Sequence, residues 1–185
     1  MFFSILMNMI PEKVARSTAE AFTVFYNEYL PKIFRYMSYR VTDIHLAEDL
    51  TSTVFEKALT KFKSYRPEKA AISTWIFKIA RNTLIDHFRV SGRRKTVPLE
   101  EMDKQPEDDI TPEESYLEKE EVGILRECLE KLSAKERDII SLKFGAEMNN
   151  RQIAGLLGMT DSNVGVILFR AVRKMREDFA GWRDG

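Results

Sequence analysis

The side chains best suited to binding chemistry form one polar stripe within residues 72–90. They recur at intervals of three and four residues, which places them on one face of a helix. The stripe consists of Trp75, Lys78, Asn82, Asp86 and Arg89, and the cations Arg93, Arg94 and Lys95 follow it. Cations neutralise phosphates, an aromatic ring can stack on a base, and an amide can hydrogen bond to a base edge. The pattern favours contact with nucleic acid over the alternative that Trp75 packs beneath the preceding loop.

A second candidate site lies in residues 150–178, where two short apolar patterns face each other across Gly158. The facing residues are Ile153, Ala154, Leu157, Val164, Leu168 and Ala171. This spacing predicts a helix-turn-helix, in which two helices cross steeply over a shared core. The turn alone fits an αα-hairpin without DNA equally well. Phosphate contact is favoured by the cations that follow, which are Arg170, Arg173, Lys174 and Arg176.

The sequence lacks the residue patterns of catalytic and metal sites. It has no glycine-rich phosphate loop and no nucleophile elbow. His45 and His87 stand alone, without a second histidine or cysteine at ligand spacing. The single Cys128 lies among leucines at helical spacing and fits a small core residue in a reducing compartment. We therefore expect neither an enzyme nor a bound metal or cofactor.

The elements that carry these residues are predicted to be helices throughout. Apolar residues recur at helical spacing in 18–41, 45–63 and 72–90, with a loop at 64–71. Pro31 is expected to split or kink the first helix, and the third should end near Ser91 and Gly92. Three more helices are predicted by local end signals. These are capping-box spacing in 133–136 and 149–152, a helix stop at Gly158 and an N-cap at Thr160. The three helices should cover 133–144, 149–157 and 160–178.

An acidic linker divides the helical pattern into two parts. From residue 92 to about 115 no apolar period survives, and Pro98, Pro106 and Pro112 interrupt the run. Net charge is zero, but Lys61–Lys95 holds ten Lys/Arg against two acids, whereas Glu100–Glu121 holds eleven acids against two lysines. We expect an N-terminal extension (1–17), a first helical domain (18–95), a linker (96–121) and a second helical domain (122–185).

The opening stretch MFFSILMNMIP is apolar, but it lacks the basic flank and the cleavage site of a signal peptide. It is also shorter than the roughly 20 residues needed to span a bilayer. We expect a cytoplasmic protein without membrane insertion.

Taken in order, the motifs resemble those of the sigma-70 family of bacterial sigma factors. They read LAEDLTSTVFEKAL, STWIFKIARNTLIDHFR, an acidic linker, LSAKERDIISLKF and RQIAGLLGMTDSNVGVILFRAVRKMR. The likeness is to the small two-domain extracytoplasmic-function (ECF) group, and it extends from about Phe22 to Phe179. It implies an all-α fold of two small domains: region 2, with three or four helices, and region 4, with the helix-turn-helix. It also implies a non-catalytic subunit that binds the β and β′ subunits of core RNA polymerase, promoter DNA and an anti-sigma factor.

The resemblance assigns residues to each role. Helix 45–63 resembles the segment that binds the β′ clamp helices, with a polar face of Glu48, Asp49, Ser52, Thr53 and Glu56. The −10 site would comprise Trp75, Lys78, Asn82, Asp86, Arg89, Arg93 and Arg94. Asn82 stands where the family commonly places a residue that contacts a flipped base. The −35 site would comprise Arg151, Asp161, Ser162, Asn163, Val166, Arg170, Arg173 and Lys174.

The sequence departs from the family pattern at two places. Ser52-Thr53 stands where the polar face often has Gln-Glu, and Gly165-Val166-Ile167 stands where many members have Lys-Ser-Arg. Ile167 should turn toward the core, so that Val166 is the residue that can touch a thymine methyl. With fewer polar base contacts, DNA shape should carry more of the specificity. The main alternative is a regulator that binds DNA without polymerase, although it leaves the polar face of helix 45–63 unexplained. A sigma fold that has lost promoter function is the third hypothesis.

Overall fold

The computed structural model describes residues 12–41, 43–94 and 123–183, and every regular element within them is helical. The prediction of an all-α fold is therefore confirmed for this part of the chain. The predicted acidic linker and the first eleven residues lie outside it. The helices are α2 (Glu12–Ser38), α3 (Ile44–Lys61), η1 (Phe62–Ser64), α4 (Ile72–Arg94), an unlabelled helix at 123–130, α6 (Ala134–Ile140), the π-helical η2 (Ser141–Gly145), α7 (Asn150–Leu157) and α8 (Asp161–Arg183).

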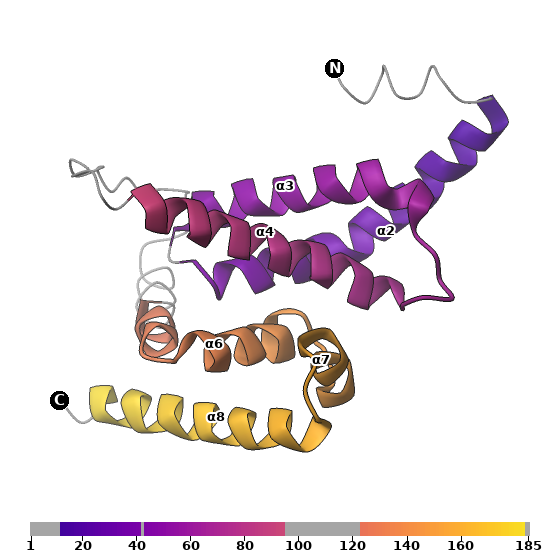
Figure 1. Cartoon of the computed structure of the whole chain (residues 1–185). Helices are drawn as coiled ribbons and strands as arrows, with labels where there is room; N and C mark the ends of the chain where they lie inside the picture. The colour runs from indigo at the N-terminus through magenta and orange to yellow at the C-terminus, as the bar shows by residue number, and fades with distance from the viewer. Residues whose placement is uncertain (1–11, 42, 95–122, 184–185) are drawn as a thin grey trace.

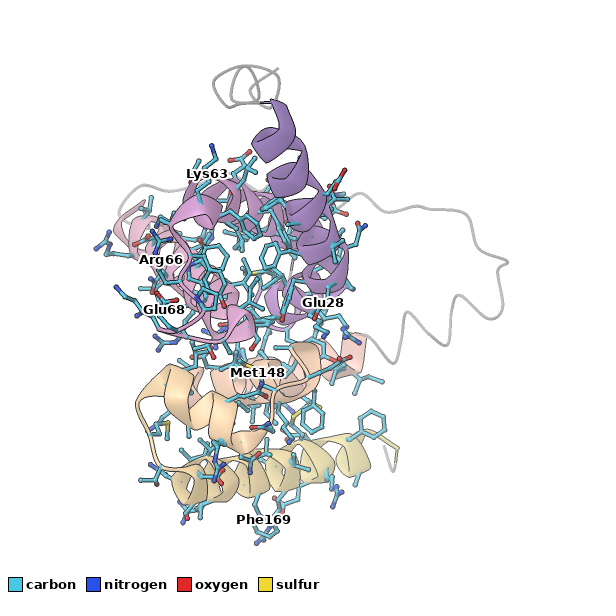
Figure 2. All side chains as sticks on the ribbon, turned by 90° about the vertical axis from the view of Figure 1, so that its right-hand side faces the viewer. Glu28, Lys63, Arg66, Glu68, Met148 and Phe169 are labelled. Atoms are coloured by element: carbon cyan, nitrogen blue, oxygen red, sulfur yellow. The ribbon has the colours of Figure 1, made fainter. Side chains whose placement is uncertain are left out.

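The helices form two layers (Figure 1). Helices α2, α3 and α4 make one layer, which we call the N-terminal unit (residues 12–94). The other layer, the C-terminal unit (residues 123–183), contains α6, α7 and α8, and α8 lies on its outer side. One hydrophobic cluster joins the layers, because Tyr36 and Phe77 of the first unit share it with Leu142, Met148 and Ile153 of the second. Figure 2 shows Met148 where the two layers meet.

The predicted helix boundaries of the C-terminal unit are set by local hydrogen bonds. The Ser133 hydroxyl accepts from the Glu136 amide, and the Asn149 side chain accepts from the Gln152 amide, so both capping boxes form. Gly158 ends α7 with φ 66° and ψ 41°, a left-handed conformation that favours glycine. The Thr160 hydroxyl then accepts from the Asn163 amide at the start of α8.

The N-terminal unit differs from the expectations at three places. Pro31 does not split α2, which continues from Glu12 to Ser38, and both Pro31 and the residue four positions earlier are exposed to water. Helix α4 reaches Arg94, two residues beyond Gly92, and within it the Ser91 hydroxyl donates to the His87 carbonyl. Phe88 follows Phe77, Ala80 and Leu84 at helical spacing, which predicts a buried side chain. It is nevertheless 44% exposed, because the buried side of α4 ends at Leu84.

Candidate nucleic-acid interface

The polar stripe of α4 lies on its solvent side. Lys78 and Asn82 are exposed, while Phe77 and Ala80 on the opposite side are buried. Asp86 and Arg89, one turn further on, are also exposed and form an ion pair of 3.2 Å with each other. Arg93 and Arg94 form the last two residues of α4, and their side chains lie outside the described part of the chain. The stripe therefore offers an amide and cations to a ligand of negative charge.

Trp75, the aromatic member of the stripe, is half-buried in a cluster of rings. Its ring centroid lies 5.2 Å from that of Tyr65, 5.9 Å from Phe25 and 6.3 Å from Phe62. Tyr65 belongs to the loop before α4, and its hydroxyl donates to the Ala70 carbonyl. The indole thus packs beneath the preceding loop, and a base can reach only its exposed part. Stacking of a base on Trp75 stays a prediction.

The helix-turn-helix forms as its spacing predicts. Helices α7 and α8 meet at 107°, within the range of this motif, across the turn at Gly158. Ile153, Ala154 and Val164 are buried between them.

Among the described residues, no single helix is long and apolar enough to cross a membrane. Only the bent pair α7 and α8 has the length and composition of a span when the two helices are taken together.

The outer face of α8 carries all but one of the residues predicted to read DNA in the C-terminal unit. The exposed ones are Asp161, Ser162, Asn163, Val166, Arg170, Arg173 and Lys174, and Arg151 on α7 is exposed as well. Ile167 is half-buried and packs against the core, as expected, whereas Val166 is 48% exposed. Gly165 lies opposite Asn150, where an added Cβ would sit 3.7 Å from the amide nitrogen, so close packing does not require glycine here.

Sequence reasoning missed Phe169, which is 70% exposed and lies less than one turn from Val166. Figure 2 shows it pointing outward from α8, away from the rest of the molecule. An apolar residue in a helical pattern suggests a core position. Only the position of Phe169 on the helix, off the face that Val164 and Ala171 bury, could have indicated that it is exposed. Together the two side chains make an apolar strip between polar residues.

Two of the predicted phosphate contacts have partners within the chain. Arg173 Nε donates to Glu177 Oε1 at 2.7 Å, which raises the pKa of the exposed guanidinium. Lys174 Nζ donates to the Lys131 carbonyl at 3.2 Å, just past the end of helix 123–130. Both cations remain at the surface, so they can exchange these partners for phosphate oxygens at low cost.

The polar face of α3 lies over a groove between α2 and α3. Glu48, Asp49, Ser52 and Glu56 are exposed, and Thr53 is half-buried with its hydroxyl donating to the Asp49 carbonyl. Ser52 and Glu56 border a groove of about 410 Å³ whose other walls include Phe22, Tyr26 and Phe55. An apolar floor with acidic and hydroxyl edges is suited to a protein helix rather than to DNA.

The C-terminal unit also contains an apolar groove of about 500 Å³ between helix 123–130 and α8. Leu125, Ile140, Phe144 and Met175 are among its lining residues. Cys128 lies in its wall, and burial raises the pKa of this thiol, which fits the prediction of an unreactive core cysteine. No group of three metal-ligating side chains exists among the described residues.

Two family models and several relatives match this chain. Residues 25–94 match Sigma-70 region 2, and residues 123–175 match Sigma-70 region 4. The ECF RNA polymerase sigma factor BldN of Streptomyces coelicolor is 30% identical over 91% of this chain, which spans 64% of the length of BldN. SigM of Bacillus subtilis, also an ECF sigma factor, is 25% identical over 82% of this chain and 90% of its own.

Solved structures show the same fold. The sigma factor RpoE of Bartonella quintana, in complex with the anti-sigma factor NepR, has a TM-score of 0.68 at 21% identity, over 87% of this chain and 98% of its own. CnrH, in complex with the cytosolic domain of CnrY, has a TM-score of 0.57 at 17% identity, over 97% of this chain and 96% of its own.

Proposed function

We propose that this chain, which belongs to the extracytoplasmic-function group of the sigma-70 family, binds core RNA polymerase and directs it to promoters. The observation that carries the proposal is that α3, α4 and α8 each turn a polar or mixed face outward from a shared core. A polymerase subunit that reads two promoter elements needs three such surfaces. A regulator that acts without polymerase would need only the helix-turn-helix.

The α4 stripe is proposed to bind the melted −10 element. A base extruded from the duplex loses its stacking and pairing, and the protein must replace both. Asn82 is exposed and carries both a donor and an acceptor, so its amide can bond to a base edge. Lys78 and Arg89 flank it and can neutralise the adjoining phosphates. Arg93 and Arg94, at the end of the same helix, are proposed to extend this basic surface.

The outer face of α8 is proposed to enter the major groove at the −35 element. Ser162 and Asn163 at the start of the helix can bond to base edges, while Arg170 and Arg173 contact phosphates. Val166 and Phe169 add an apolar strip, and apolar side chains recognise the thymine methyl group. Val166 lies within the three positions, 165–167, where many family members have Lys-Ser-Arg, so an apolar contact is proposed to replace a polar one there.

The remaining partners follow from the family and from the α3 groove. The exposed carboxylates of Glu48, Asp49 and Glu56 are proposed to meet basic residues of the β′ clamp helices, with an apolar side chain in the groove that Glu56 borders. RpoE is held by an anti-sigma factor in its solved structure, and we propose such a partner here too. The proposed role is non-enzymatic and cytoplasmic.

The test is transcription by the purified chain with bacterial core polymerase on a library of randomised promoters, followed by sequencing of the transcripts. The wild type should select a shared −35 and −10 pattern. Asn82→Ala should relax preference at one −10 position by about tenfold, since a good amide–base contact contributes about 1–3 kcal/mol of discrimination. Asn27→Ala, which removes an exposed asparagine of α2, is the matched control. Unchanged −10 preference in Asn82→Ala would remove this residue from the site, and DNA binding without core would favour the stand-alone regulator.

A further inference from the structure

The central line of the outer face of α8 combines polar and apolar side chains. Residues three and four positions apart lie on one line of a helix. The exposed residues with this spacing are Ser162, Val166, Phe169 and Arg173. Val164, on the opposite side of the helix, is fully buried, so this line projects furthest from the core. If α8 lies in a major groove, these four side chains are nearest to the base edges.

The polar members of this line do not distinguish thymine from cytosine. The two bases differ in the major groove at position 4, where thymine has an accepting oxygen and cytosine a donating amino group. The Ser162 hydroxyl can donate to the first and accept from the second. Arg173 lies in the middle of α8, beyond the N-terminal residues that contact base edges in such helices, and its Nε donates to Glu177. Hydrogen bonds from this line therefore do not select between the two pyrimidines.

The apolar strip, by contrast, offers a surface on which a methyl group can be buried. Phe169 points outward from α8 (Figure 2), and the exposed Val166 lies three positions earlier. Phe169 also borders a groove of about 420 Å³ whose wall includes Asn150, Gly165 and Leu168. Gly165 adds no side chain to that wall, so the ring is accessible from its flank as well as from its tip. A methyl group against the strip would therefore exchange water for both the valine and the aromatic ring.

The feature that such a strip can recognise is a methyl group at C5 of a pyrimidine, and thymine is not the only base that carries one. Cytosine has a hydrogen at C5. Methylation there gives 5-methylcytosine, whose methyl group occupies the same place in the major groove as that of thymine. The burial of apolar surface depends on the area covered and has no direction. It therefore does not sense whether an oxygen or an amino group stands at position 4 of the base.

The other exposed residues of the face have separate tasks. Asp161 and Asn163 lie on either side of the central line, so they are placed to meet neighbouring base pairs. Arg170 and Lys174 are exposed cations, and cations that contact phosphates supply affinity without sequence information. A preference for one methyl group can therefore decide between promoters that the rest of the face binds equally well.

We propose that the apolar strip of Val166 and Phe169 reads the 5-methyl group itself, so that 5-methylcytosine can replace thymine in the −35 element and cytosine methylation strengthens promoter recognition. This inference rests on the proposed function, and it adds a modified base to the DNA that this site takes. The strip binds a methyl group that the DNA already carries, and the chain performs no chemical step on it. Cytosine and uracil, which lack the group, are both disfavoured.

The test uses the full chain with core polymerase and a promoter that the wild type selects from the randomised library. Each thymine of the −35 element is replaced in turn by 2′-deoxyuridine opposite adenine, or by 5-methylcytosine or cytosine opposite guanine. Thymine and deoxyuridine then differ by one methyl group, and so do 5-methylcytosine and cytosine. Competition binding measures the ratio of affinities within each pair.

The variants remove apolar side chains from the surface at two places. Val166→Ser combined with Phe169→Ser removes the strip. Val24→Ser is the matched control, because Val24 is also exposed but lies on α2 of the N-terminal unit. Circular dichroism verifies that each variant keeps its helix content.

The wild type should prefer the methylated member of both pairs by about fourfold at one or more −35 positions, which is the factor expected when one apolar carbon is removed from water. The double variant should lose both preferences, and Val24→Ser should keep them. A preference for thymine over deoxyuridine without one for 5-methylcytosine over cytosine would overturn the inference. Preferences that persist in the double variant would overturn it as well. Both of these results leave the proposed function standing, whereas a complex that binds no promoter would overturn the function and the inference together.

Discussion

In the N-terminal unit the candidate DNA stripe shares residues with the hydrophobic core, whereas in the C-terminal unit it lies clear of the core. Trp75 belongs to both the α4 stripe and the ring cluster formed with Phe25, Phe62 and Tyr65. On α8, Val166 and Phe169 are exposed while Val164 and Ala171 hold the helix in place. A substitution at Trp75 on α4 should therefore change both stability and DNA binding. A substitution on the outer face of α8 should change DNA binding with little effect on stability.

The two units also secure their helices differently. The N-terminal unit uses three helices of 18 to 27 residues, packed through large aromatic side chains. The C-terminal unit uses short helices such as α6 and α7, of seven and eight residues, which begin with capping boxes. Helices this short are marginal in isolation, so caps and turn residues contribute a larger share of their stability. The comparison predicts different responses to equivalent substitutions.

The largest expected effect is at Trp75. Trp75→Ala should lower the free energy of unfolding by about 2–3 kcal/mol, somewhat below the range for a fully buried tryptophan. Phe169→Ala should change it by no more than about 0.5 kcal/mol, because the side chain is mostly in water, yet it should weaken binding to thymine-containing −35 elements. Urea unfolding followed by circular dichroism measures the first quantity, and promoter binding by the polymerase complex measures the second.

Trp75→Phe is the control for this comparison, since it keeps an aromatic ring among its neighbours and should retain most of the stability. A Trp75→Ala chain that unfolds like the wild type but melts promoters poorly would show that the indole is a stacking platform rather than a core residue. The difference between the two units would then disappear.

An intermediate effect is expected for the cations of α8. Neutralising Arg173 and Lys174 together, as Arg173→Gln and Lys174→Gln, should weaken binding to all promoters similarly. It should also reduce the slope of log affinity against log salt by about one to two, because each phosphate contact releases counterions. Titrations of the polymerase complex over a range of salt concentrations measure the slope.

Glu177→Gln is the matched control, because it removes the negative charge of the 2.7 Å partner of Arg173 while leaving both cations in place. It should leave affinity unchanged or raise it slightly. A loss of affinity confined to particular −35 sequences in the double variant would mean that these residues read bases. It would contradict the proposed phosphate contacts of Arg173 and Lys174.

The features predictable from sequence are those that depend on neighbouring residues along the chain. Hydrogen bonds that span three or four positions determine where these helices begin and end. They set the N-caps at Ser133, Asn149 and Thr160 and the helix end at Gly158. The outward position of Val166 follows equally from helical periodicity. None of these depends on how the two units pack.

The features that sequence reasoning missed depend on contacts between distant segments. Asp138 looks like a surface residue within AKERDII, and its burial is explained only by Arg81, 57 positions earlier, and by Tyr36, 102 positions earlier. Phe88 has the spacing of a core residue, but α4 extends beyond the helices that would cover it. Spacing locates the face of a helix, and tertiary packing decides what that face meets.

The smallest expected effect distinguishes the two capping boxes. The Glu136 carboxylate accepts from the Ser133 hydroxyl (2.7 Å) and the Ser133 amide (2.9 Å), and these bonds lower the pKa of Glu136, the hydroxyl most strongly. Because the folded-state pKa lies below the unfolded value of about 4.3, the stabilisation is present above that value and is lost as pH falls through the folded pKa. In the second box the neutral Gln152 accepts from the Asn149 amide at 2.9 Å, so that box is insensitive to pH.

Glu136→Gln should therefore keep the capping box at neutral pH but remove its contribution to acid sensitivity, and Gln152→Glu should add a similar sensitivity at the start of α7. The change should not exceed about 0.5 kcal/mol, since Glu136 is only half-buried and water screens the interactions of its carboxylate. Thermal unfolding between pH 7 and pH 3.5 measures it, as a shift of roughly 1–2 °C in Tm. If Glu136→Gln keeps the full acid dependence of the wild type, the bonds to Ser133 are not what lowers this pKa, and the two boxes are electrostatically equivalent.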